Sequence, residues 1–275
     1  MFLHQASHSP KILDFLNLKG TAPALTWYGM QGGIERIELS GKVCANHLAK
    51  IANYLAMECD LGPDTCIGID LPPHWKSSLW AMGALLIGAQ VRFWPTRISA
   101  RTAEAFAADG SAAVDPQDFL QSVDVLLTDR PEFWLSELSP QILTDFAGEI
   151  IALNLHSLAF SWNGELPSGV LDGQAEVLGQ ADVMLAVECC NDANAMQFIL
   201  PVAQLHDLPA GMLLAIDADR ARTALSVRNS SACLQAIISG WAAGLAVVIV
   251  DDPMLQDPKN VQNLLRSEGF SDEYI

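Results

Sequence analysis

The most constraining feature of this sequence is a strand–helix–strand passage between residues 66 and 94. Cys66–Leu71 is a short apolar run that two prolines end, and His74–Ile87 is an apolar stretch long enough for a helix. Gly88 ends that helix, and Ala89–Trp94 has the composition of a second strand. Strand, crossover helix and strand in this order predict a parallel sheet with a right-handed connection.

A second passage has the same design. WAMGALLIGAQVRFW, from Trp80, and ISGWAAGLAVVIVDD, from Ile238, are each typical of a helix, a glycine break and a buried strand. The predicted fold class is therefore α/β, with two related lobes whose mainly parallel sheets are flanked by helices. We expect an N-terminal lobe over residues 1–160 and a second lobe over 161–275, either separate or packed as one domain.

Shorter signals predict the remaining elements. They indicate a hairpin over residues 24–39, a helix capped by Ser40, strands at Val123–Thr128, Glu149–Leu155 and Met212–Ile216, a helix after Pro131, and a largely helical region from near Asp219 to Ala243. Residues 160–180 contain Gly164, Pro167, Gly169 and Gly173 and predict a connecting stretch between the halves.

The charge of the chain excludes some partners. Acidic residues outnumber basic ones 32 to 15, which gives a formal charge of −17. Nucleic-acid and anionic membrane surfaces both require clustered Lys and Arg, so we expect neither partner. The 20 residues Ser231–Val250 carry no charge, but a glycine break and a change to β-branched residues favour a buried helix and strand over a membrane span.

The cysteines point to a reducing compartment. They form no C-x-x-C pair and no His accompanies them at metal-ligand spacing, so we expect no metal site and a cytoplasmic location. Met1–Pro10 lacks the pattern of a signal peptide. The six cysteines are Cys44, Cys59, Cys66, Cys189, Cys190 and Cys233.

The best candidate for a ligand site is Pro72–Pro73–His74–Trp75. It follows a strand at the carboxyl end, where open α/β sheets bind their ligands. In this interpretation His74 donates to an anion, and Trp75 stacks on a ring or covers an acyl chain. The structural alternative is a helix start, with Pro73 in the first turn and Trp75 packed on the sheet.

Asp217 and Asp219 form a second candidate, because they also follow a predicted strand. They could bind a cation or a hydroxyl-bearing ligand, and the structural alternative is a helix N-cap. Cys189 and Cys190 have acidic neighbours, which disfavour a reactive thiolate. The chain has neither a G-x-S-x-G elbow nor a G-x-G-x-x-G loop after a strand. We predict no catalytic residue, and the sequence indicates no particular cofactor.

A family pattern runs through residues 24–95. A hairpin and a helix lead to the turn Leu61–Asp64, the strand and proline loop Ile67–Pro73, the apolar helix Leu79–Ile87 and then Gly88–Ala89. In this order the pieces resemble the opening of acyl-CoA synthetases and other acyl-adenylate-forming (AMP-binding) enzymes. Residues 123–129 are similar to the next family strand, and 211–250 to the start of the second lobe. The resemblance implies the fold of the N-terminal part of the large domain of those enzymes.

The chain departs from that family where adenylation needs cations. The family carries a Ser/Thr/Gly-rich loop with a Lys that holds the ATP phosphates. Residues 160–210 contain no Lys, and their only hydroxyl side chains are Ser161 and Ser168. The sequence also stops at Ile275, before the regions in which the family places its ribose and magnesium acids and a late catalytic Lys. We therefore expect that this chain alone does not activate acyl groups.

Three hypotheses follow from this comparison. The first is a non-catalytic relative of the adenylate-forming enzymes that binds a small acyl or nucleotide ligand or a protein partner. The second is half of a two-chain acyl-activating ligase, in which another polypeptide supplies the missing Lys. The third is a structural interaction module, a homo-oligomer that covers exposed apolar surface by forming a homodimer.

Overall fold

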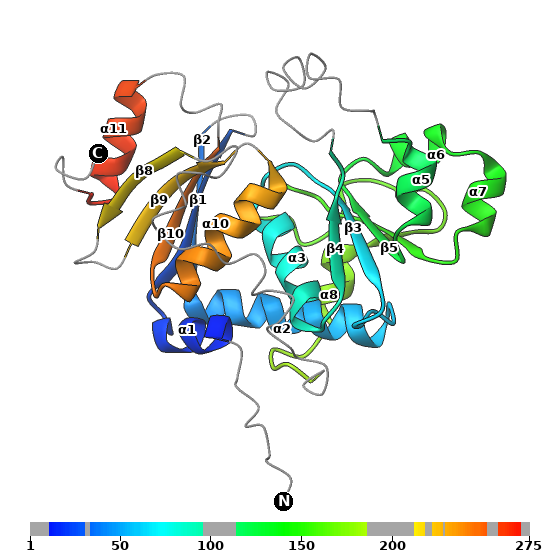
Figure 1. The fold of residues 1–275 in the computed structure, drawn as a ribbon, viewed down its shortest axis with the longest axis horizontal. Helices are drawn as coiled ribbons and strands as arrows, with labels where there is room; N and C mark the ends of the chain where they lie inside the picture. Colours follow the sequence, from blue (N-terminus) through cyan, green and yellow to red (C-terminus); the bar gives the residue numbers. More distant parts are fainter. Residues whose placement is uncertain are drawn as a thin grey trace, which may run out of the picture.

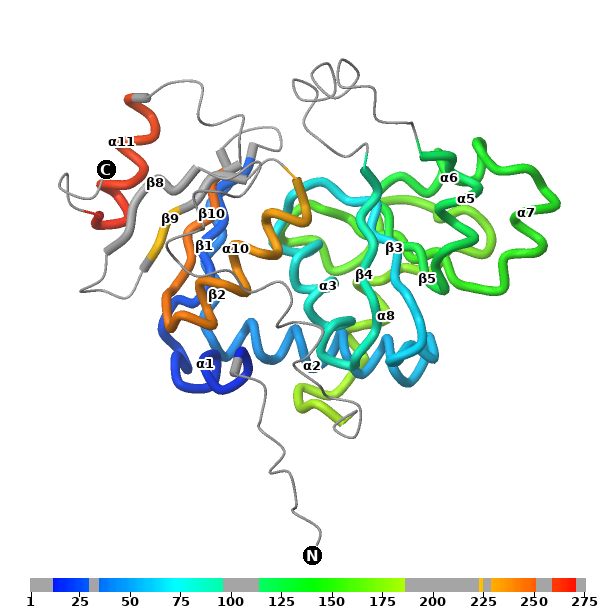
Figure 2. The backbone as a smooth tube through the Cα atoms, viewed as in Figure 1, coloured from blue at the N-terminus to red at the C-terminus, as the bar shows by residue number. Residues whose placement is uncertain are grey.

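The computed structural model describes residues 11–30, 34–95, 114–185, 212–217, 222–227, 229–251 and 258–270. Two five-stranded sheets are separated by a layer of helices (Figure 1). The chain begins in one sheet, crosses to the other and returns, as the backbone trace shows (Figure 2).

The first sheet, sheet A, joins strands from both ends of the chain. It consists of β1 (Pro23–Met30), β2 (Ile34–Ser40), β8 (Met212–Asp217), β9 (Arg222–Val227) and β10 (Ala246–Asp251). The strand order is β2-β1-β10-β9-β8. The three central strands are parallel, whereas the edge strands β2 and β8 run antiparallel to their neighbours.

The second sheet, sheet B, is entirely parallel. It consists of β3 (Cys66–Asp70), β4 (Gln90–Phe93), β5 (Val125–Thr128), β6 (Glu149–Ala152) and β7 (Val170–Asp172). The strand order is β4-β3-β5-β6-β7. Every residue of β3 and β5 is buried, as expected for parallel strands that are covered on both faces.

Helices α3 (Trp75–Leu86) and α10 (Ser230–Ala242) lie between the sheets, and α1 (Lys11–Lys19) and α2 (Gly41–Met57) pack against them along the lower side of the view (Figure 1). All twelve residues of α3 are buried. One continuous cluster of buried side chains contains these helices together with residues of both sheets, so the two sheets share a hydrophobic core.

The remaining helices cover the outer surfaces. Three short helices, α5 (Pro116–Gln121), α6 (Pro131–Glu137) and α7 (Pro140–Asp145), lie on the outer side of sheet B, around the buried Trp134 (Figure 1). The helix α11 (Pro258–Ser267) packs on sheet A through Leu265, and α8 (Gly173–Leu178) contacts α2.

The similarity between the two helix–glycine–strand passages is confirmed. Helices α3 and α10 both end before a glycine in the left-handed region, Gly88 at φ +87° and Gly244 at φ +78°. In each case the glycine N–H and the following N–H return to carbonyls of the last helical turn. The chain then enters β4 or β10, and β3, α3 and β4 form the predicted parallel unit.

Several local predictions are also confirmed, and two are wrong. The hairpin is β1–β2, and the Ser40 hydroxyl caps α2 by accepting from the N–H of Val43. The region from Asp219 to Ala243 is not largely helical, because β9 precedes α10 and the helix begins only at Ser230. Residues 160–180 are more than a connection, since they contain β7 and α8.

Lobes divided at residue 160 do not coincide with the two sheets. Sheet A takes β1 and β2 from the first predicted lobe and β8, β9 and β10 from the second. Its central pairing, β1 with β10, joins residues more than 200 positions apart in sequence. The boundary between residues 160 and 161 itself stays a prediction.

Of the four cysteines that the structure describes, three are buried and Cys59 is half-buried. Within the described residues, Cys44, Cys66 and Cys233 are buried thiols that form no disulfide, and burial raises the pKa of Cys44 to about 12. Cys189 and Cys190 lie outside the described residues. Among the helices that are described, none is both long enough and apolar enough to cross a bilayer. The cytoplasmic location stays a prediction.

Candidate functional site

The predicted site at Pro72–Trp75 lies at the carboxyl end of β3 and forms the start of α3. His74 is the N-cap: its Nδ1 accepts from the backbone N–H of Lys76 at 3.1 Å, and its own N–H donates to the Ser77 hydroxyl at 3.2 Å. Because α3 begins at Trp75, Pro73 precedes the helix instead of lying in its first turn. The capping role is therefore present, and ligand binding by Pro72, Pro73 and His74 stays a prediction.

His74 is also too buried to carry a charge. Desolvation, followed by the nearby Lys76 charge, lowers the pKa of His74 to about 3, so its imidazole is neutral at neutral pH. Its ring centre lies 5.3 Å from that of Trp27. A neutral His74 can interact with a ligand only as a hydrogen-bonding group, not as a cation.

A pocket of about 510 Å³ opens beside Trp75. Its walls come from β2, α2, the start of α3, the loop 157–160 and α8, and we call it the α2–α3 pocket. It lies at the carboxyl edge of sheet B, where parallel sheets bind ligands. The apolar side chains of its walls include Leu39, Val43, Ile51, Leu79, Trp80 and Val177.

Three basic side chains line this pocket, although the whole chain has only 15 Lys and Arg residues. Arg36 is occupied, because it donates to Glu268 and to Glu38, each at 2.7 Å. Lys50 is occupied as well: it donates to the carbonyls of two residues in the segment 178–185 and pairs with Asp182 at 3.1 Å.

Lys76 differs from the other two cations. It is only 5% exposed, and its Nζ donates to the carbonyls of Asn154 at 2.8 Å and His156 at 2.7 Å. In the part of the chain that the structure describes, no carboxylate forms an ion pair with it. Burial lowers the pKa of Lys76 to about 8, and the charge of Glu35 partly opposes this shift. An ammonium has three N–H donors, so one remains for a ligand.

Two further polar groups of the pocket have no partner among the described residues. The Ser157 hydroxyl and the Trp75 indole N–H are both buried, and neither has a hydrogen bond. Both residues line the pocket with Lys76, and Ser157 directly follows His156, whose carbonyl accepts from Lys76. Buried donors without partners cost free energy unless a bound molecule or water satisfies them.

The segment 178–185 is fixed to α2 and supports one wall of the pocket. Asn53 is fully buried, and its amide donates to the carbonyls of Ala181 at 3.2 Å and Val183 at 2.8 Å. The N–H of Leu185 donates in return to the Asn53 carbonyl oxygen at 2.8 Å. Together with Lys50, Asn53 therefore determines where this wall lies.

Another buried acid near the same edge is fully occupied. Asp70, at the end of β3, accepts two hydrogen bonds from Arg130, at 2.8 and 2.9 Å, and others from Thr128 and Trp134. These contacts join α6 to sheet B. Asp70 thus has a structural role and does not line the α2–α3 pocket.

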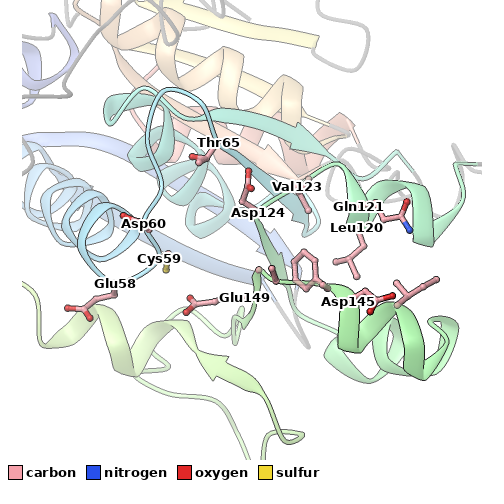
Figure 3. A pocket seen from close by; sticks show the side chains of 14 residues that line it. Glu58, Cys59, Asp60, Thr65, Leu120, Gln121, Val123, Asp124, Asp145 and Glu149 are labelled. Carbon is pink, nitrogen blue, oxygen red and sulfur yellow. The ribbon is translucent and has the colours of Figure 1, made fainter.

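A second cavity, of about 610 Å³, lies at the opposite, amino-terminal edge of sheet B (Figure 3). Its side chains are strongly acidic and include Glu58, Asp60, Asp124, Asp145 and Glu149. No group of three or more His, Cys, Asp or Glu within the described ranges could hold a metal ion. A solvated acidic surface is sufficient to explain this cavity.

The candidate at Asp217 and Asp219 is only partly described. Asp217 ends β8, which is antiparallel to β9, so it lies at the edge where the parallel strands of sheet A begin. That edge is opposite to the one where parallel sheets bind ligands. Asp219 lies outside the described residues. The helix-cap alternative is wrong for this pair, because a strand follows and Asn229 caps α10.

Sequence reasoning located Trp75 but missed Lys76, Ser157 and Lys50. Lys76 is adjacent to the predicted motif, and a lysine in the first turn of an otherwise apolar helix was a usable signal. Ser157 gave none, because only the tertiary structure brings the loop after β6 to the start of α3.

Comparisons with known proteins agree with this architecture. Acetoacetyl-CoA synthetase from Streptomyces lividans superposes with a TM-score of 0.57 at 15% identity, over 90% of this chain and 38% of that one. The Brucella canis acyl-CoA synthetase superposes with a TM-score of 0.57 at 12% identity, over 95% of this chain and 46% of that one. The luciferase-like enzyme of the mealworm Zophobas morio superposes with a TM-score of 0.57 at 8% identity, over 96% of this chain and 58% of that one. The chain thus spans well under two thirds of these solved proteins.

The fold is that of the N-terminal domain of acyl-CoA synthetases and related adenylate-forming enzymes, which confirms the resemblance seen in the sequence. No family model matches the chain. A curated protein of Mycobacterium tuberculosis, named "TIGR03089 family protein", is 27% identical over 267 residues, which cover 94% of this chain and 95% of that protein. Its name states no activity.

Proposed function

We propose that this protein binds a small acyl ligand in the α2–α3 pocket and does not catalyse acyl adenylation by itself. The observation that carries the proposal is a pocket of about 510 Å³ at the carboxyl edge of sheet B, with apolar walls and buried donors that no described residue accepts from. Its volume is within the range of small-molecule sites, which combine apolar walls with a few polar groups.

An acyl ligand fits this pocket better than a nucleotide. Polyphosphates need several cations or N–H donors around them, but Arg36 and Lys50 are already engaged by protein groups. The apolar walls suit a hydrocarbon chain. The related solved proteins include an acyl-CoA synthetase and a fatty acyl-adenylate ligase, and their names describe acyl chemistry.

The sequence supports the second half of the proposal. There is no lysine between Lys76 and Lys259, and residues 160–210, where adenylate-forming enzymes carry their phosphate loop, contain no lysine or arginine. Adenylation depends on cations placed around the developing phosphate charge. We therefore expect no ATP-dependent release of pyrophosphate from this chain with any carboxylic acid.

A thermal-shift panel with fatty acids, acyl-CoAs, coenzyme A, AMP and ATP tests the proposal. A ligand at 100 times its Kd raises the free energy of unfolding by about 2.7 kcal/mol, and we expect such a shift with the fatty acids. Val43→Trp should abolish the shift, because Val43 lines the pocket and is 41% exposed. Leu18→Trp is the matched control, since Leu18 is 88% exposed and lies on α1, away from the pocket.

The other outcomes support different functions. Pyrophosphate release by the purified chain would contradict the non-catalytic assignment, and release only with a second polypeptide would favour the two-chain ligase. The absence of any shift would favour a homodimeric interaction module. The observation in favour of a homodimer is the exposure of the apolar side chains Leu158 and Phe160. Light scattering measures the oligomeric state directly.

A further inference from the structure

We infer that the α2–α3 pocket binds its ligand with the charged end inward: Lys76, Ser157 and Trp75 hold a singly charged carboxylate at the buried end, and the acyl chain runs outward. This inference rests on the proposed function, because it assigns the orientation of the ligand proposed there. It follows from where the polar and apolar side chains of the pocket lie.

The hydrogen-bond donors are at the buried end. Lys76 is 5% exposed and Ser157 and Trp75 are similarly buried, and each has one donor that the described residues do not use. A carboxylate accepts several hydrogen bonds through its two oxygens, so it can satisfy an ammonium, a hydroxyl and an indole N–H together. Bonds of this kind to an ionised acceptor are stronger than neutral ones.

The exposed lining of the pocket includes several apolar side chains, beside the charged side chains Arg36, Glu38 and Asp182. Leu158 and Phe160 are each 70% exposed, and with the half-exposed Leu178 and Val43 they line the outer part of the pocket. Covering solvent-exposed apolar side chains with a hydrocarbon chain removes apolar surface from water, which contributes favourable binding free energy. A ligand with its chain at the mouth and its carboxylate at Lys76 therefore matches both ends of the pocket.

The charge of the site limits the head group to one negative charge. Of the three cations, Arg36 is neutralised by Glu268 and Glu38, and Lys50 by Asp182. Lys76 is left as the one lining cation without a carboxylate partner in the described part of the chain, and its lowered pKa reflects that environment. A phosphate with two negative charges would be only half compensated.

This orientation has a functional consequence. Adenylation requires that the carboxylate oxygen reach the α-phosphate of ATP, but here the carboxylate is bound behind its own chain. A ligand bound in this way is held and protected rather than activated. The inference therefore predicts a carrier or sensor of acyl acids.

Isothermal titration calorimetry with three compounds tests the inference on the full chain. They are decanoic acid, decanol, and decanoic acid with a dansylamino group on its terminal carbon. We expect both acids to bind, because a group on the terminal carbon projects from the mouth. Decanol should bind about 10- to 100-fold more weakly, since it lacks the charge that Lys76 binds.

Two variants and a control locate the head group. Lys76→Met should lower the affinity for decanoic acid by about 10- to 100-fold and leave the affinity for decanol unchanged. Decanol binding therefore also reports that the variant is folded. Ser157→Ala should lower the affinity for decanoic acid by roughly 2- to 10-fold while leaving the Lys76 contacts intact. Lys42→Met, an exposed position on α2 outside the pocket, should bind like the unmodified protein.

Each contrary result has a distinct meaning. Equal affinity for the acid and the alcohol, or an unchanged Lys76→Met variant, would overturn the inference and leave the proposed function standing. If decanoic acid binds and its dansyl derivative does not, the acyl chain, not the head group, is at the buried end of the pocket, and the inference is overturned. Failure of all three compounds to bind the unmodified protein would overturn the proposed function together with the inference.

Discussion

Lys76 is the residue whose environment most needs an explanation. A buried charge without a counter-ion is costly, and among the described residues Lys76 has no carboxylate partner. Two backbone carbonyls offset part of its lost hydration. The neighbouring Trp75 ring, 5.6 Å from Nζ, adds a cation–π contribution. This environment is typical of a lysine whose charged form becomes more stable when an anion binds. Lysines with perturbed pKa values in pockets mark functional sites more often than chance.

The pH dependence of acid binding is a prediction at this scale. The pKa of Lys76 is lowered to about 8 in the unliganded protein, and a bound carboxylate raises it. The affinity for decanoic acid should therefore be constant from neutral pH to about 8 and should fall as the pH rises further and Lys76 loses its proton. Calorimetry across this pH range measures the effect.

Lys76→Arg is the matched variant for this experiment, because a guanidinium stays protonated throughout the range. Its affinity should not fall above pH 8. Among the described residues, the other titratable groups that interact with the charge of Lys76 are Glu35, His47 and His74. The pKa values of both histidines are lowered, so they stay neutral over this range. A fall of the same size in the arginine variant would exclude Lys76 as the titrating group.

At the scale of elements, α2 and α3 approach each other closely at Gly83. A Cβ atom on Gly83 would lie 2.6 Å from Cγ2 of Ile51, a buried β-branched residue of α2 with little freedom to move. Gly83→Ala should lower the free energy of unfolding by about 1–3 kcal/mol, despite the better helix propensity of alanine. Chemical denaturation measures the change.

The control for Gly83 is Gly62, in the turn before β3. No atom lies within 4 Å of a Cβ placed there, so Gly62→Ala should change the free energy of unfolding by no more than about 0.5 kcal/mol. If Gly83→Ala were as stable as Gly62→Ala, the helices could separate locally, and the wall that Ile51 and Leu79 give to the α2–α3 pocket would be adjustable.

Elements were predictable from sequence where their signals are local. Gly88 and Gly244 ended their helices as expected, because a left-handed C-cap depends on adjacent residues alone. Arg222–Val227 was wrongly assigned to a helix because no glycine or proline separates β9 from α10. Pairing with β10 determines its strand conformation, and that partner is distant in sequence.

At the scale of the whole molecule, sheet A joins the two ends of the chain. The parallel pairing of β1 with β10 connects residues 25–28 to residues 247–250. A fragment of residues 1–160 lacks β8, β9, α10 and β10, so its α1, α2 and β1 would lose the partners that bury them. We expect this fragment to lack a cooperative thermal transition, whereas the full chain has one.

Circular dichroism melting of the fragment and the full chain tests this expectation. A fragment with a cooperative transition and dispersed amide resonances would support the predicted boundary between residues 160 and 161. Restoration of the transition on mixing the fragment with residues 161–275 would show that the two parts recognise each other. That result would identify the shared core as the source of stability.

The sequence alone determined the local architecture of this protein: its α/β class, the β3–α3–β4 unit, the capped helices and the resemblance to adenylate-forming enzymes. These features depend on periodicity, glycine and proline positions and the order of neighbouring elements. The pocket was decided only by tertiary structure, because its donors come from α3 and from the loop after β6, about 80 residues apart, and Asn53 positions a third segment. Burial then set the pKa of Lys76, which no pattern of neighbouring residues could predict.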